Sequence, residues 1–188
     1  MKKTYRNAVR SRNLIRQAFL ELLQEKPLEK ITVVDITTRA DLSRNTFYTH
    51  YQDIYAILEE YQNTMLAELD SALTEATAQH TPEDTLHLLL KIVQHLEENQ
   101  ATYRTLMRTS YTDTFVRQLK QRLPQHVSHV LSSGEVSDSV GLQILLATLS
   151  SGFVDLVVAY LENKTDLSLS EIAQQMHRIY LAALPLYV

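Results

Sequence analysis

Residues 43–50 concentrate side chains that can recognise a nucleic acid. Seven of these eight residues carry a hydrogen-bonding group, and only Phe47 does not. Arginine can donate paired hydrogen bonds to guanine, asparagine can pair in the same way with adenine, and hydroxyl groups suit phosphate oxygens. On a short helix that enters a major groove, such groups would read DNA sequence. The set is Ser43, Arg44, Asn45, Thr46, Tyr48, Thr49 and His50.

The flanking residues predict two short helices joined by a tight turn. Thr32 is a cap candidate with an acidic residue three positions on, and the helix it opens should end near residue 39 or 40. Ser43 is a second cap candidate for a helix that reaches about His50. Apolar or small residues lie where two such helices would pack, at Ile36, Ala40, Leu42 and Phe47. This pattern predicts a helix-turn-helix, although three-helix bundles that bind no DNA share the spacing.

The rest of the chain also favours helices. Apolar residues recur at helical spacing, and Gly and Pro are scarce. We expect an all-α protein of about nine helices, with a helix-turn-helix domain at 1–52 and a helical-bundle domain at 53–188. Beyond the helix-turn-helix, the expected helices cover about 4–25, 54–79, 82–98, 101–108, 112–132, 137–163 and 168–184.

Charge separates the two ends of the 188-residue chain. The net charge is −4, but residues 1–51 carry ten Lys and Arg against five Asp and Glu, so that segment is +5 and the remainder is −9. A basic segment on an acidic body is a candidate surface for a polyanion such as double-stranded DNA. The basic residues 2–12 are interpreted either as a disordered tail or as an arm that reaches the minor groove.

The chain lacks the residues that several classes of chemistry require. The chain has no cysteine, and all three glycines lie at 134 or later, which excludes thiolate chemistry and an N-terminal glycine-rich phosphate loop. No catalytic triad or carboxylate pair stands out, so we expect no enzyme and no cofactor. His87 and His95 share a predicted helix but lie two turns, roughly 12 Å, apart, and we expect no metal site.

The segment 137–163 is apolar on nearly every side. Gln143 and Asp155 interrupt it, so we expect no membrane span and a cytoplasmic protein. A soluble helix of this kind must be covered on more than one side. A second copy of the chain is the simplest cover, which predicts a homodimer through helices at about 137–163 and 168–186.

The motif resembles the TetR family of transcriptional regulators. The resemblance rests on Ile31 to Ile36, on Ala40 to Ser43, on Thr46 to Tyr51 and on Ile57-Leu58, and it is strong over about residues 10–60. Asp41 and Asn45 replace glycines that are common in the family, and Ile54 replaces a lysine that usually meets a phosphate. The missing lysine leaves open a relative that has lost operator binding and acts as a helical protein-interaction module.

The resemblance implies roles for individual residues. Arg44, Asn45, Thr46 and Thr49 would read bases, whereas Tyr48, His50 and Thr32 would contact phosphate. Arg39 is open between a contact and a structural role. The family also implies a homodimer on a palindromic operator, repression by default, and a small-molecule effector in the body. For that effector we expect a pocket formed by Tyr61, Met65, His87, Tyr103, Met107, Tyr111, Phe115 and Phe153, with ordinary core packing as the alternative.

Overall fold

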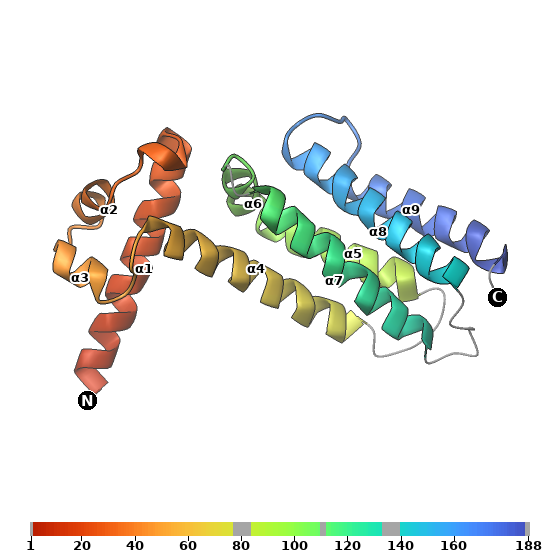
Figure 1. The fold of residues 1–188 in the computed structure, drawn as a ribbon, viewed down its shortest axis with the longest axis horizontal. Coiled ribbons are helices and arrows are strands. Elements are labelled where there is room, and N and C mark those ends of the chain that lie inside the picture. The colour runs from red at the N-terminus through yellow and green to blue at the C-terminus, as the bar shows by residue number, and fades with distance from the viewer. Residues whose placement is uncertain (1, 77–83, 110–111, 133–139, 187–188) are drawn as a thin grey trace. The chain divides into compact units, whose positions relative to one another are not determined.

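The computed structural model of this chain describes residues 2–76, 84–109, 112–132 and 140–186, and the side chains of most of them. This part of the chain forms nine α-helices and two short 3₁₀ helices, and it contains no strand, as predicted for an all-α protein (Figure 1). The chain divides into two compact units. The head comprises Met1–Met65 with Arg108–Ser110, and the body comprises Leu66–Met107 with Tyr111–Val188.

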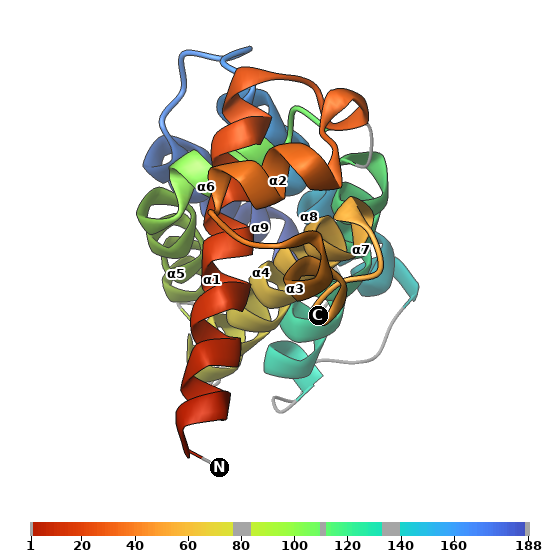
Figure 2. The same ribbon diagram turned by 90° about the vertical axis from the view of Figure 1, so that its left-hand side faces the viewer.

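The head is built on the long helix α1 (Lys2–Glu25), which packs against α2 (Val33–Arg39) and α3 (Arg44–Tyr48). Figure 2 shows the two short helices beside α1. Phe19 of α1, Ile36 of α2 and Phe47 of α3 are fully buried, so each helix contributes one large apolar side chain to a common core. The first half of α4 (Ile54–Ala76) belongs to the same unit.

Caps fix the ends of both short helices. The Thr32 hydroxyl accepts from the backbone N–H of Asp35, while the Asp35 carboxylate accepts from the backbone N–H of Thr32. Each side chain therefore satisfies the backbone N–H of the other residue. The Ser43 hydroxyl accepts from the backbone N–H of Thr46 and opens α3. Between them Asp41 adopts the left-handed conformation, with φ of 52°. Aspartate tolerates that region better than most residues, which makes the turn possible here.

The body consists of the second half of α4 and five further helices. These are α5 (Asp84–Glu98), α6 (Gln100–Leu106), α7 (Thr112–Ser132), α8 (Val140–Leu161) and α9 (Leu169–Ala183), followed by the 3₁₀ turn η2 (Leu184–Leu186). Helix α8 packs against α7 and α9, and α9 packs against α5 (Figure 1). Helix α8 is long and apolar enough to cross a membrane by composition alone, but core helices share that property, and α8 packs within the bundle.

The observed helices follow the predicted ones closely. The first helix begins at Lys2 rather than Thr4, so the basic residues 2–12 are helical and not a disordered tail. Helix α3 ends at Tyr48, two residues earlier than expected. A 3₁₀ turn, η1 (Leu28–Lys30), was not predicted, and it buries Leu28 just after Pro27. The expected helix portions at 77–79, 82–83 and 137–139 lie outside the described residues.

We predict that Thr32→Ala lowers the free energy of unfolding by about 1 kcal/mol, because it removes the cap of α2. Urea denaturation followed by circular dichroism measures this change. Thr38→Ala is the matched control, since Thr38 is exposed inside the same helix and its hydroxyl forms no hydrogen bond among the described residues. Equal effects of the two substitutions would contradict the assigned cap.

Candidate nucleic-acid interface

Helix α3 turns one apolar side chain inward and the rest of its surface outward. Phe47 is fully buried, whereas Arg44, Asn45, Tyr48 and Thr49 are exposed, and Tyr48 keeps 58% of its surface accessible. The Phe47 ring contacts the rings of Tyr48 and Tyr51, with centroid distances of 5.5 and 5.9 Å. The buried ring therefore fixes how the exposed side chains on either side of it are presented.

The hydroxyl groups of this segment are partly engaged within it. Ser43 Oγ and Thr46 Oγ1 lie 2.9 Å apart, and the Thr49 hydroxyl donates to the carbonyl of Thr46 at 2.6 Å. A hydroxyl that donates one hydrogen bond still has oxygen lone pairs free. Helix α3 therefore offers both donors and acceptors along its exposed side, which is the mixture that a base edge requires.

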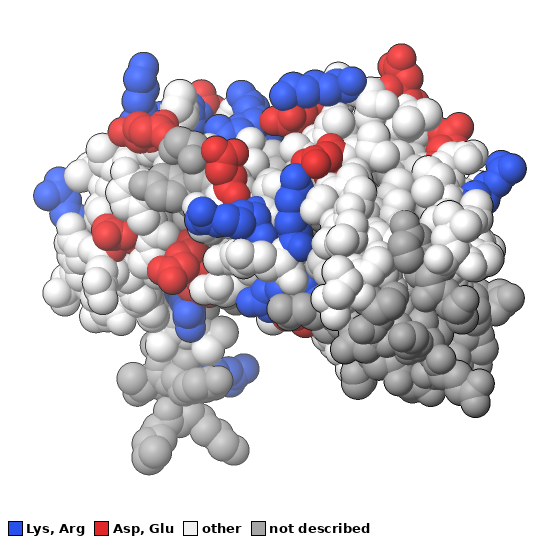
Figure 3. All heavy atoms as spheres, turned by 45° about the vertical axis from the view of Figure 1, so that its right-hand side comes forward, with Lys and Arg blue, Asp and Glu red and all other residues white. Residues whose placement is uncertain are grey.

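Four cations of the head, Arg12, Arg16, Lys26 and Arg39, pair with carboxylates of the head. Arg39 contacts Glu21 at 3.3 Å and Glu25 at 2.9 Å, and these bonds raise the pKa of Arg39 and lower that of Glu25. Lys26 binds Asp35 at 2.8 Å and helps to lower the pKa of that carboxyl to about 2. On the face drawn in Figure 3, Lys and Arg side chains accordingly lie interspersed with Asp and Glu.

Four arginines of the head form no ion pair with a described residue. They are Arg44 on α3, Arg6 and Arg10 on the first half of α1, and Arg108. An open hollow separates the first half of α1 from α3, and Asn7 and Arg10 line it from one side while Asn45, Thr46 and Thr49 line it from the other. Sequence reasoning left residues 2–12 open between a disordered tail and a minor-groove arm, and it did not place Asn7 and Arg10 on a surface shared with α3. The arginine spacing at helical period was the signal that could have found them.

His50 is less available than its position in the sequence suggests. Its Nε2 atom lies 2.7 Å from the hydroxyl of Ser11, so it connects the end of the α3 segment to α1. The side chain is half-buried. The predicted phosphate contact of His50 remains a prediction, and the observed bond gives the residue a structural role in the head.

Tyr51, the residue after His50, is buried and contacts a partly exposed polar cluster of Arg12, Arg16 and Glu60. Arg12 donates to the Glu60 carboxylate at 2.9 Å and more weakly to the Tyr51 hydroxyl at 3.4 Å. Arg16 also lies near Glu60, at 3.6 Å, and its guanidinium stacks 4.5 Å from the centre of the Tyr61 ring. Burial raises the pKa of Tyr51 to about 12. For Glu60, burial alone would raise the pKa, but hydrogen bonds from Tyr51 and Arg12 lower it on balance.

Ile54, which stands in place of the expected lysine, is part of the core of the head. It is only 7% exposed, and Asp53 beside it caps α4 by accepting from the backbone N–H of Ala56 at 2.9 Å. An apolar residue at this position adds burial to the head and provides no phosphate contact. Any binding of DNA must therefore rest on the other residues of this surface.

The body contains a cavity that matches part of the predicted ligand pocket. Tyr103, Met107, Phe115 and Phe153 line it, together with aliphatic residues that sequence reasoning missed because core and pocket residues share one hydrophobic pattern. His87 is exposed and does not line it, and Tyr111 lies outside the described residues. Tyr61 and Met65 belong to the head, where Tyr61 stacks on Phe19. Among the described residues, no cluster of three His, Asp or Glu side chains is placed to hold a metal ion.

Comparison with known proteins agrees with this geometry. Residues 15–61 match the family model described as "Bacterial regulatory proteins, tetR family", and residues 83–181, just over half of the chain, match "Transcriptional regulator C-terminal region" of the same family. The chain is a member of the TetR family of transcriptional regulators.

Individual relatives have low sequence identity to this chain. The sequence is 27% identical over 124 residues to an uncharacterized HTH-type transcriptional regulator, YxbF of Bacillus subtilis, and the match covers 61% of this chain and 32% of that protein. This TetR-family chain thus aligns with only about a third of its curated relative's length. Among solved structures, a TetR regulator from Streptococcus agalactiae has a TM-score of 0.66 at 23% identity and covers 95% and 97% of the two chains. Thermus thermophilus FadR, a TetR-family repressor in complex with lauroyl-CoA, has a TM-score of 0.61 at 18% identity and covers 90% and 93%. At these identities the two structures show the shared fold alone.

We predict that Glu60→Gln destabilises this TetR-family chain by about 1 kcal/mol, because it weakens the bonds from Arg12 and Arg16. Since the pKa of Glu60 is lowered in the folded protein, the contribution is present above the ordinary pKa of 4.5 and is lost as the pH falls below it. Urea denaturation at pH 7 and at pH 3 measures both effects. Glu59→Gln is the control, because Glu59 is exposed and pairs with no described residue. A difference between the two variants that persists at pH 3 would contradict the cluster.

Proposed function

We propose that this TetR-family regulator binds a palindromic operator as a homodimer, with α3 of each protomer in a major groove. The observation that carries the proposal is the state of Arg44. It projects from α3 without an ion pair among the described residues, whereas Arg39 pairs with Glu21 and Glu25, and Arg12 and Arg16 share the carboxylate of Glu60. Because Arg44 has no such pair on the exposed side of α3, its charge is available to a partner.

The proposed division of roles follows from chemistry and exposure. Arg44 suits guanine and Asn45 suits adenine, while Thr46 and Thr49 add hydroxyl groups along the same face. Tyr48 and the N-terminal end of α2 at Thr32 would contact phosphates. Arg10 and Asn7 would extend the contact along α1, because they face α3 across the open hollow.

The proposed dimer rests on α8. Its most apolar stretch has a mean hydropathy of 1.9, yet only 33% of that stretch is buried within one chain. Ile144 is 61% exposed on α8 and Ile179 is 50% exposed on α9. Gly152 costs helix stability, and a Cβ atom there would meet nothing within 4 Å in the single chain. Both features are explained if a second α8 and α9 cover this surface and approach closely at the glycine.

The proposed regulation uses the body. A ligand that binds one conformation of the bundle better than another would shift the population of operator-binding dimers. We propose repression, relieved by such an effector, in the cytoplasm where operator DNA is found. The alternative function is a helical interaction module that has lost operator binding, favoured by the buried Ile54 and by the internal pairing of Arg12, Arg16 and Arg39.

We predict that Arg44→Ala weakens binding to the preferred operator by about 1–3 kcal/mol and relaxes the preference at one base position. Electrophoretic shift of genomic fragments selected by the wild-type protein, repeated over a range of salt concentrations, measures both effects. Tyr48→Ala should weaken all sequences alike. Arg39→Ala is the matched control, because its charge is already paired, and it should change affinity less than Arg44→Ala does.

Two results would decide against operator binding. One is a wild-type protein that selects no genomic fragment, which would favour the interaction module. The other is binding that does not weaken as salt rises, because phosphate contacts release counterions and must be salt-dependent.

We predict that Ile144→Glu converts the dimer into monomers without unfolding the chain, because the side chain is exposed in one chain and would be buried in the pair. Light scattering at micromolar concentration measures the mass against twice the chain mass of 21.6 kDa. Ala101→Glu, at an exposed position of α6, is the control and should leave the dimer intact. A wild-type mass of one chain would refute the dimer.

A further inference from the structure

Two cavities adjoin inside the body. The first, here called the aliphatic cavity, is the one lined by Tyr103, Met107 and Phe115, and its volume is about 40 Å³. The second, here called the hydroxyl cavity, has a volume of about 30 Å³ and lies among α5, α7, α8 and α9. Leu123 and Phe153 line both of them. The two hollows are therefore neighbouring parts of one interior space, separated by shared side chains.

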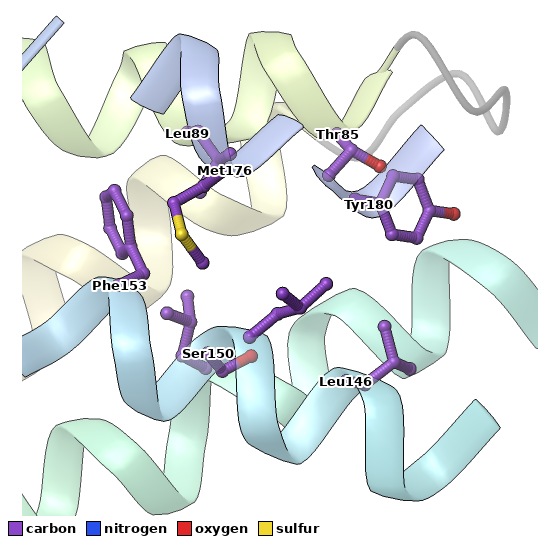
Figure 4. A pocket seen from close by; sticks show the side chains of 9 residues that line it. Thr85, Leu89, Leu146, Ser150, Phe153, Met176 and Tyr180 are labelled. Atoms are coloured by element: carbon purple, nitrogen blue, oxygen red, sulfur yellow. The ribbon is translucent and has the colours of Figure 1, made fainter. Parts of the chain in front are cut away.

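The hydroxyl cavity contains polar groups that nothing in the described protein satisfies. Thr85 is 6% exposed and Tyr180 is 2% exposed, and neither hydroxyl has a hydrogen-bond partner among the described residues. Figure 4 shows them together at one end of the cavity, with Phe153 at the other end. Burial raises the pKa of Tyr180, and the interaction of its hydroxyl with the nearby Thr85 hydroxyl lowers it in part. Ser150 adds a further buried hydroxyl to the wall.

Unpartnered buried hydroxyls are costly, because each has given up its hydrogen bonds to water. The aliphatic cavity has no such group. Its one hydroxyl belongs to Tyr103, and that oxygen lies 3.1 Å from Nε2 of His95 and is thus engaged. A ligand that occupied both cavities would meet free hydrogen-bonding groups only at the end marked by Thr85 and Tyr180.

The residues that line the two cavities also determine whether a charged or a neutral ligand is favoured. Neither cavity is lined by Lys, Arg, Asp or Glu among the described residues. An ion placed there would lose its hydration without gaining a counter-charge, which disfavours charged ligands strongly. A neutral polar group, by contrast, could accept hydrogen bonds from the Thr85 and Tyr180 hydroxyls.

We propose that the effector of this regulator is a neutral, elongated aliphatic molecule with one oxygen-bearing polar end. The polar end binds Thr85 and Tyr180, and the aliphatic chain passes Phe153 into the aliphatic cavity. This inference rests on the proposed regulation by an effector and names its chemical class. Since the cavities are smaller than such a molecule, its binding moves the surrounding helices apart, and this couples occupancy to the conformation of the body.

Two neutral and two charged probes of equal chain length test the proposal on the full-length protein without DNA. The neutral probes are n-octanol and methyl octanoate, and the charged ones are octanoate and protonated octylamine at pH 7. Calorimetric titration should show saturable binding of the neutral probes and at least tenfold weaker binding of the charged ones. Thr85→Val and Tyr180→Phe should each weaken binding of n-octanol about three- to tenfold, the effect of one hydrogen bond.

Matched variants separate this effect from general damage. Thr105→Val removes a buried hydroxyl that donates to the Ala101 carbonyl. Tyr160→Phe removes a part-buried hydroxyl that accepts from Gln100. Neither residue lines either of the two cavities. Both should retain wild-type affinity for n-octanol. Thr85→Val and Tyr180→Phe should also leave the melting temperature of the unliganded protein unchanged or raise it, because they remove an unsatisfied group.

Three results would overturn the proposal. One is no binding of any probe, as expected if the cavities hold only water. The second is equal binding of neutral and charged probes. The third is unchanged n-octanol affinity in both hydroxyl variants. Because no readout involves DNA, a failure here is distinct from a failure of operator binding.

Discussion

Helix α3 has only five residues, too few to hold a helical shape in water without support. Its shape depends on burial of Phe47 in the core of the head and on the Ser43 cap at its start. The exposed side chains of α3 that the proposed function uses take their direction from that anchored turn. The long α1, the capped α2 and the left-handed turn at Asp41 all serve to hold Phe47 in place.

The cations of the head fall into two groups, those that stabilise the fold and those that are available for recognition. Arg12, Arg16 and Arg39 join α1, α2 and α4 to one another through carboxylates, so they stabilise the head. Arg44 and Arg10 form no ion pair with a described residue, and Arg10 lines the open hollow opposite Asn45, the neighbour of Arg44. A count of charges along the sequence finds the basic segment, but only the structure separates cations that hold the fold together from those that remain for DNA.

Sequence reasoning predicted the elements well because capping and periodicity are local signals. The Thr32 and Ser43 caps and the stripe of α1 follow from residues a few positions apart, and the structure confirms them. Long-range contacts were not predictable in this way. The bond from His50 to Ser11 and the pairing of Arg39 with Glu21 join distant segments. In the body, half of the expected pocket residues line the cavity, because an apolar stripe does not reveal which side chains leave space between them.

Footprinting of the wild-type protein on its preferred genomic fragment tests the central claim most directly. If α3 of each protomer enters a major groove, protection should fall on two half-sites of related sequence. Their centres should be one helical turn, about 34–36 Å, or a multiple of that distance apart. Protection of a single unrepeated site, or no protection at a concentration where the protein is a dimer, would contradict the account.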